Sequence, residues 1–252
     1  MSDSQPIEPR QRARAPDSFH TTRWSVVLAA GQSAEPAAGA ALATLCQSYW
    51  FPLYAYIRRR SATIDEAQDL TQEFFVRLLE KDTLAVAAPD RGRFRAFLLT
   101  ALKHFLANQA DKAHAQKRGG GRSPLSLDFD AGESRYHREP SHALTAETLF
   151  ERQWTLTLLD RVMSALEAEL SAAGRLPQFE VLREFIVRGS GDASYIQAAE
   201  ALGINEPAAR TAAHRLRRRY RELLRAEIAE TVADESEIDA EIRRLFASLA
   251  AR

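Results

Sequence analysis

The chain has 252 residues, enough for one large or two small domains, and 45% of them are hydrophobic, as in an ordinary globular protein. No stretch approaches the roughly eighteen uninterrupted apolar residues of a membrane-spanning helix, and no apolar signal segment follows the N-terminus, so we predict a cytoplasmic protein with no membrane contact. The 34 basic and 34 acidic residues balance, but the basic ones gather in residues 93–122 and 210–225. Net charge therefore does not exclude a nucleic-acid partner.

Residues 1–18 are polar, proline-containing and aperiodic, which predicts a disordered tail. Beyond them, apolar residues recur at spacings of three and four, and no run alternates as a strand does. We therefore predict an all-α protein, with a short helix within residues 19–33. The single cysteine, Cys46, lies among apolar residues without a disulfide or metal partner, and we interpret it as a small buried side chain.

A helix is predicted over residues 64–80. Thr63 and Glu66 form a capping-box pair at its start. Ala67, Leu70, Phe74 and Leu78 share its core-facing stripe, and the outward residues are Asp69, Gln72, Glu73 and Arg77. A second helix is predicted over residues 94–115. Its inward residues are Phe94, Phe97, Leu98, Ala101, Leu102 and Phe105, and its outward residues are Arg95, Lys103 and Asn108.

Residues 119–145 are rich in glycine and scattered charges, which predicts a flexible linker. Periodicity returns in residues 150–166 and again in 179–186, where Pro177 suits the first helical turn. We predict two small helical domains, residues 19–118 and 146–231, followed by a helical extension over residues 232–252.

The segment 195–219 has the layout of a helix-turn-helix. Small Ala199 allows close helix crossing, Gly203 can adopt the left-handed conformation of a sharp turn, and Asn205 suits the N-cap of the second helix. The predicted core residues of the second helix are Ala209, Ala213, Leu216, Tyr220 and Leu223. Its outward residues are then Arg210, Thr211, His214, Arg215 and Arg218, a face typical of a helix that reads a major groove. The alternative is a solvated basic helix in a bundle.

Two motifs identify a family. Residues 67–79 (AQDLTQEFFVRLL) resemble the signature of region 2 in the sigma-70 family of bacterial RNA polymerase sigma factors, and residues 92–98 (GRFRAFL) are similar to its promoter-melting segment. Residues 195–224 resemble its region 4. Because no other sigma region lies between them, the chain is similar to the extracytoplasmic-function (ECF) subgroup. Phe97 stands where the family usually has tryptophan, and its closing arginine run is diluted.

The resemblance implies roles for particular residues. Contact with core RNA polymerase falls to Asp69, Gln72 and Glu73, with Phe75 supporting that surface. Contact with the minus-10 element falls to Arg93, Arg95, Lys103, Asn108, Lys112, Lys117 and Arg118, with residues 81–92 helping to hold an unstacked base. Contact with the minus-35 element falls to Arg210, Thr211, His214, Arg215 and Arg218, whereas Tyr195 is expected in the core.

The family's mechanism needs no catalytic group, metal or cofactor, because core polymerase supplies the chemistry. The resemblance also admits an anti-sigma factor as a further partner. Two alternatives stay open: a helix-turn-helix regulator that binds operators as a dimer, and a helical adaptor without DNA recognition.

The C-terminal extension carries an amphipathic stripe of Ile238, Ile242, Leu245, Phe246 and Leu249. The simpler interpretation is that this helix packs on region 4 and extends its core. The sharper hypothesis is that Glu235, Glu237, Asp239 and Glu241 shield the recognition helix from DNA.

Overall fold

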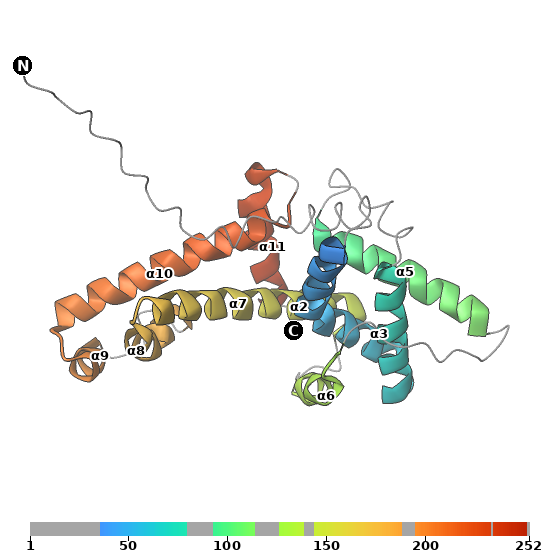
Figure 1. The fold of residues 1–252 in the computed structure, drawn as a ribbon, viewed down its shortest axis with the longest axis horizontal. Coiled ribbons are helices and arrows are strands. Elements are labelled where there is room, and N and C mark those ends of the chain that lie inside the picture. The colour runs from blue at the N-terminus through green and yellow to red at the C-terminus, as the bar shows by residue number, and fades with distance from the viewer. Residues whose placement is uncertain are drawn as a thin grey trace, which may run out of the picture.

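The computed structural model describes residues 36–79, 93–113, 126–138, 144–187, 195–232 and 234–250, and every regular element in them is helical (Figure 1). The predicted all-α class is confirmed. In chain order the elements are α2 (Pro36–Arg60), α3 (Ile64–Leu79), α5 (Phe94–Ala113), α6 (Phe129–His137), α7 (Ala146–Ala172), α8 (Leu176–Val187), α9 (Tyr195–Leu202), α10 (Glu206–Ala229), the short 3-10 helix η2 (Glu235–Glu237) and α11 (Ile238–Ala250). The tail at 1–18, the short helix expected within 19–33 and the loop 81–92 lie outside the described residues.

Helix α2 is kinked. Tyr49 has non-helical angles, φ −122° and ψ 15°, and Pro52 follows three residues later. Proline has no amide hydrogen to bond the preceding turn, and its ring crowds the carbonyl there, so the helix bends at this point.

Helix α3 begins as predicted. The Glu66 amide donates to the Thr63 hydroxyl at 3.1 Å, and the Glu66 carboxylate accepts from the Ala62 amide at 2.8 Å. Reciprocal bonding of this kind satisfies amides that have no partner within the helix. The carboxylate reaches one residue further back than in a standard capping box.

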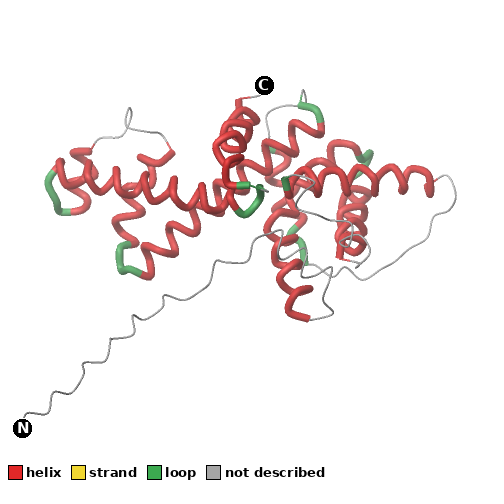
Figure 2. The backbone as a smooth tube through the Cα atoms, turned by 90° about the horizontal axis from the view of Figure 1, so that it is seen from above, coloured by secondary structure: helices red, strands yellow, loops and turns green. Residues whose placement is uncertain are grey.

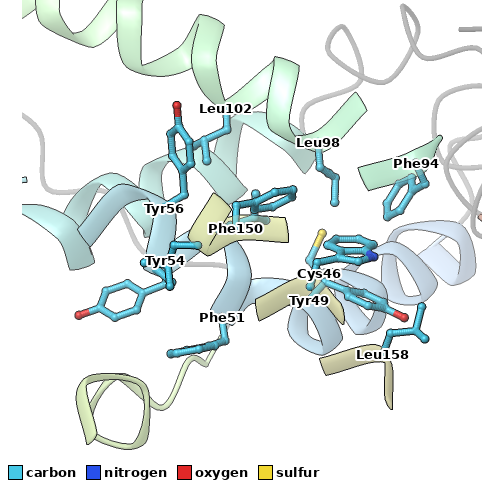
Figure 3. Close-up of a cluster of buried hydrophobic side chains, with 14 of the residues drawn as sticks. Cys46, Tyr49, Phe51, Tyr54, Tyr56, Phe94, Leu98, Leu102, Phe150 and Leu158 are labelled. Atoms are coloured by element: carbon cyan, nitrogen blue, oxygen red, sulfur yellow. The ribbon is translucent and has the colours of Figure 1, made fainter. Parts of the chain in front are cut away.

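The first core lies where α2, α3, α5 and the first half of α7 meet. Figure 3 shows Tyr49 from α2, Phe94 and Leu98 from α5, and Phe150 from α7 converging on this centre. Tyr49 stacks on Trp154 with ring centroids 4.4 Å apart. Cys46 is buried among these side chains, which confirms its predicted structural role, and burial raises the pKa of its thiol to about 12.

The second core lies where the end of α7 meets α8, α9 and α10. Its buried members include Leu166, Phe179, Leu182 and Phe185, from the two periodic segments predicted upstream of the helix-turn-helix. Helices α7 and α10 lie side by side along the long axis, with α8 and α9 at one end and α2, α3, α5 and α6 at the other (Figures 1 and 2). Helices α7 and α10 both contribute to the two cores, since α10 has Leu224 and Ile228 in the first and Ala213 and Leu216 in the second.

The predicted linker contains a helix. Within residues 119–145, α6 packs on α2: Phe129 meets the Trp50 ring edge-on at 5.5 Å, and Gly132 lies against the same ring. The prediction of an irregular segment is wrong here, because docking on α2 stabilises α6 although its own sequence lacks an apolar repeat. The predicted start of the second domain at residue 146 also differs from the packing. Phe150 and Trp154 follow that boundary but belong to the first core.

Helix α11 packs against α7 and α10, but Ile238 and Leu245 are buried in the first core and not in the region 4 core that the simpler interpretation expected it to extend. Within the described residues, none of the four carboxylates pairs with the recognition face at residues 210–218. Asp239 pairs with Arg225, near the end of α10, and Glu241 pairs with Arg93 and Arg95 of the first domain, away from residues 210–218 (Figure 1). Within the described ranges, no helix has the length and apolarity needed to cross a bilayer.

Candidate nucleic-acid interface

The helix-turn-helix forms as predicted. Gly203 has φ 64°, the left-handed conformation that its position in the turn requires. The Asn205 side chain accepts a hydrogen bond from the Ala208 amide at 2.9 Å and so caps α10. Ala199 and Ala209 are both buried, and α9 packs against α10, so a small residue at 209 is compatible with this packing.

All five predicted minus-35 residues lie on one exposed face of α10. They are Arg210, Thr211, His214, Arg215 and Arg218. The opposite face of α10 supplies Ala213 and Leu216 to the second core. This division fixes which side chains a ligand can reach without any change in the fold.

The exposed arginines differ in how they are held. Arg210 donates to Glu206 at 2.6 and 2.9 Å and lies over the Tyr195 ring, 4.5 Å from its centroid. Tyr195 is itself buried and stacked on Phe185 at 4.4 Å, as expected for a core residue. Arg210 is therefore pre-oriented, because a carboxylate and a fixed ring restrict its rotamers.

Arg218 pairs with Glu222 at 3.0 Å. Hydrogen bonds from Arg218 and Arg219 hold the pKa of Glu222 below its usual value. Both Arg218 and Glu222 are exposed, so this pair is readily exchanged for a pair with another anion. Of the arginines on this face, Arg215 forms no ion pair with any described residue.

The predicted minus-10 residues on α5 are arranged differently. Lys103 and Asn108 are exposed as expected, but Arg95 is only 3% exposed, so its predicted outward position is wrong. Arg95 lies in ion-pair contact with Glu151 of α7 at 2.9 Å and Glu241 of α11 at 3.0 Å. Lys112 belongs to the last turns of α5, and Lys117 and Arg118 lie outside the described residues.

A groove of about 430 Å³ runs between α3 and α5. Phe74, Phe97 and Phe105 contribute to its apolar wall, and His104 and Asn108 lie among its polar lining. Phe97, which the resemblance aligned with a tryptophan, is half-buried and lines this groove. Aromatic walls beside polar groups suit the stacking of an unpaired base.

The predicted polymerase face on α3 is partly exposed. Asp69 is exposed, Gln72 and Glu73 are half-buried, and Glu73 pairs with Arg77 at 2.9 Å. Phe75 is fully buried, in keeping with its predicted role of supporting this surface rather than contacting the partner. It supports the polar stripe from below, by packing in the first core.

Sequence reasoning missed the carboxylates that meet α5. Glu147 and Glu151 stand one turn apart on α7, and Glu241 lies on α11. The spacing of the first two was visible in the sequence, but their partners are more than forty residues away. No local pattern identifies such partners.

No family model, no curated protein and no solved structure matches this chain.

Proposed function

We propose that this chain is a sigma factor of the ECF kind, which binds core RNA polymerase and directs it to promoter DNA. The observation that carries the proposal is the exposed cationic face of a helix-turn-helix, in the same chain as a helix that resembles sigma region 2. Arginine on such a face pairs with guanine edges and phosphates, at about 1–3 kcal/mol of discrimination for a good bidentate pair. The groove at Phe97 supports the proposed capture of an unstacked base.

The mechanism rests on binding energy alone. Region 2 docks on polymerase through the stripe at Asp69, Gln72 and Glu73, and α10 enters the major groove of the minus-35 element. Several modest contacts together offset the few kcal/mol needed to unstack a base step of the minus-10 element. Polymerase then carries out the chemistry.

The test is transcription by core polymerase with this protein on a library of promoter fragments, alongside co-purification with polymerase. We expect Asp69→Ala with Glu73→Ala to weaken polymerase binding by about thirtyfold or more, since interface hot spots cost more than about 1 kcal/mol each and about 1.4 kcal/mol is tenfold. Glu180→Ala, an exposed acidic residue of α8, is the matched control and leaves binding unchanged.

We expect Arg215→Ala with Arg218→Ala to abolish most promoter-dependent transcription while polymerase binding persists, because the two surfaces lie on different helices. Absence of polymerase binding by the unaltered chain would overturn the proposal. Tight operator binding by a dimer without polymerase would instead favour a helix-turn-helix regulator. Transcription that is unaffected by loss of both arginines would favour an adaptor.

A further inference from the structure

The cations of α5 with described side chains, together with Arg93 directly before the helix, are paired with carboxylates from elsewhere in the chain. Arg93 is in contact with Glu241 of α11, and Arg95 with Glu241 and Glu151. Lys103 pairs with Glu147 of α7 at 3.0 Å. Three carboxylates are thus paired with the basic side chains of this segment, where the anionic groups of a ligand would otherwise bind.

The centre of this arrangement is unusually dry. Arg95 is 3% exposed and Glu241 is 1% exposed. Burial lowers the pKa of Arg95 and raises that of Glu151, so desolvation opposes the charged forms of both. Buried ion pairs contribute little net stability compared with apolar packing of the same volume, and their best-attested use is to specify one arrangement over another.

The element that completes this ion cluster, α11, is short, and its apolar contribution to the first core comes chiefly from Ile238 and Leu245. Helix α11 has 13 residues, and Phe246 on it remains 45% exposed. It is tied to α7 by hydrogen bonds from Arg152 and Thr155 to its carbonyl groups, at 3.0 and 3.3 Å. A short helix with limited buried apolar surface opens at a lower free-energy cost than the main core.

The start of α5 has one more tie to the same region. The Phe94 amide donates to the Thr231 carbonyl at 3.1 Å, which joins α5 to the connection between α10 and α11. Arg93, Phe94 and Arg95 are therefore all held on the α11 side of the molecule.

We propose that Glu147, Glu151 and Glu241 form an internal substitute for DNA phosphates, which holds the cations of α5 until α11 is displaced. The inference rests on the proposed function, because it concerns the surface assigned to the melted minus-10 strand. In the closed form, DNA must compete with three carboxylates already in place. In the open form, with α11 released, Arg93 and Arg95 become available to the strand.

The experiment compares single-strand binding by the full chain and by the variant Glu147→Gln with Glu241→Gln. Glutamine preserves shape but removes the charges that pair with α5. The control is Glu167→Gln with Glu180→Gln, which changes net charge equally at two exposed residues of α7 and α8. The probe is a fluorescent oligothymidylate of about twenty nucleotides, titrated by anisotropy at several salt concentrations.

We expect the double variant to bind at least about fivefold more tightly than both the unaltered chain and the control. Its affinity should also fall more steeply with salt, by about 1.4 in logarithmic slope, since each phosphate contact on a single strand contributes about 0.7. An equal gain in the control, or no gain in the variant, overturns the proposal.

Circular dichroism would detect unfolding of the double variant. If the double variant is unfolded, the single variant Glu147→Gln is used in its place. Glu147 is half-exposed, so this change is tolerated, and a gain in slope of about 0.7 is expected against Glu167→Gln. No gain overturns the proposal. Polymerase binding is measured on the same samples. A gain in DNA affinity without polymerase binding would contradict only the sigma-factor proposal. Polymerase binding without a gain in DNA affinity would contradict only the proposed internal substitute for phosphate.

Discussion

Arg95 is a charged residue in a buried position, where its polar side chain would not be expected. A guanidinium is rarely buried unless carboxylates surround it, and here Glu151 and Glu241 do so from two different helices. Helical periodicity predicted that this side chain points outward. The prediction failed because nothing in the neighbouring sequence of α5 indicates the carboxylates that pair with Arg95. One of those partners lies 146 residues further along the chain, so only the folded structure reveals it.

Replacing Arg95 by alanine should therefore be costly. Removal of one member of a buried ion pair leaves the remaining charge uncompensated, and we expect a loss of about 3–5 kcal/mol in the free energy of unfolding. Lys103→Ala, which removes an exposed pair on the same helix, should cost less than about 1 kcal/mol. Urea unfolding of the three proteins measures both values, and equal stabilities would show that Arg95 is not buried in solution.

Among the elements, the turn between α9 and α10 shows why local sequence can predict local structure. Its conformation depends on Gly203 and Asn205 themselves, and the structure has both as expected. The same holds for the start of α3, where Thr63 and Glu66 cap their own helix. Such features need no distant partner, so the sequence alone is sufficient to predict them.

Helix α6 illustrates the opposite case. Its residues show no apolar repeat, and its position depends on Trp50 and on Gly132, whose hydrogen leaves room for that ring. A Cβ atom at 132 would lie 2.6 Å from the tryptophan ring, so only glycine permits this approach. Contacts between distant segments of this kind determine the fold here, and periodicity does not report them.

The turn between α9 and α10 can be tested by replacing Gly203. Gly203→Ala should lower the free energy of unfolding by about 1–2 kcal/mol, because a side chain in the left-handed conformation meets its own backbone. Apart from residue 203 and its two chain neighbours, no heavy atom of the described residues lies within 4 Å of the added carbon, so packing against other parts of the chain does not add to this cost. Gly203→Asn should cost less, since asparagine tolerates this conformation better. Chemical denaturation followed by circular dichroism measures both, and an alanine variant as stable as the original would exclude the left-handed turn.

For the molecule as a whole, the decisive feature is that two long helices, α7 and α10, belong to both cores. Residues up to Val162 pack in the first core, and Leu166 and Leu170 pack in the second. A continuous helix transmits the loss of either core to the other, because its hydrogen bonds are broken together. We therefore expect the two cores to unfold in one cooperative transition.

Ser164 offers a way to uncouple them. It is exposed on α7 between the two sets of buried residues, so its side chain is not needed by either core. Ser164→Pro removes a helical hydrogen bond and crowds the preceding turn, at a cost of about 3 kcal/mol or more. Tryptophan fluorescence, to which Trp50 and Trp154 of the first core contribute, should then follow a different denaturation curve from circular dichroism, which reports every helix. In the original chain and in Ser164→Ala the two curves should coincide. Coincident curves in the proline variant would mean that α10, which also touches both cores through Tyr220 and Leu223, is sufficient to couple them without α7.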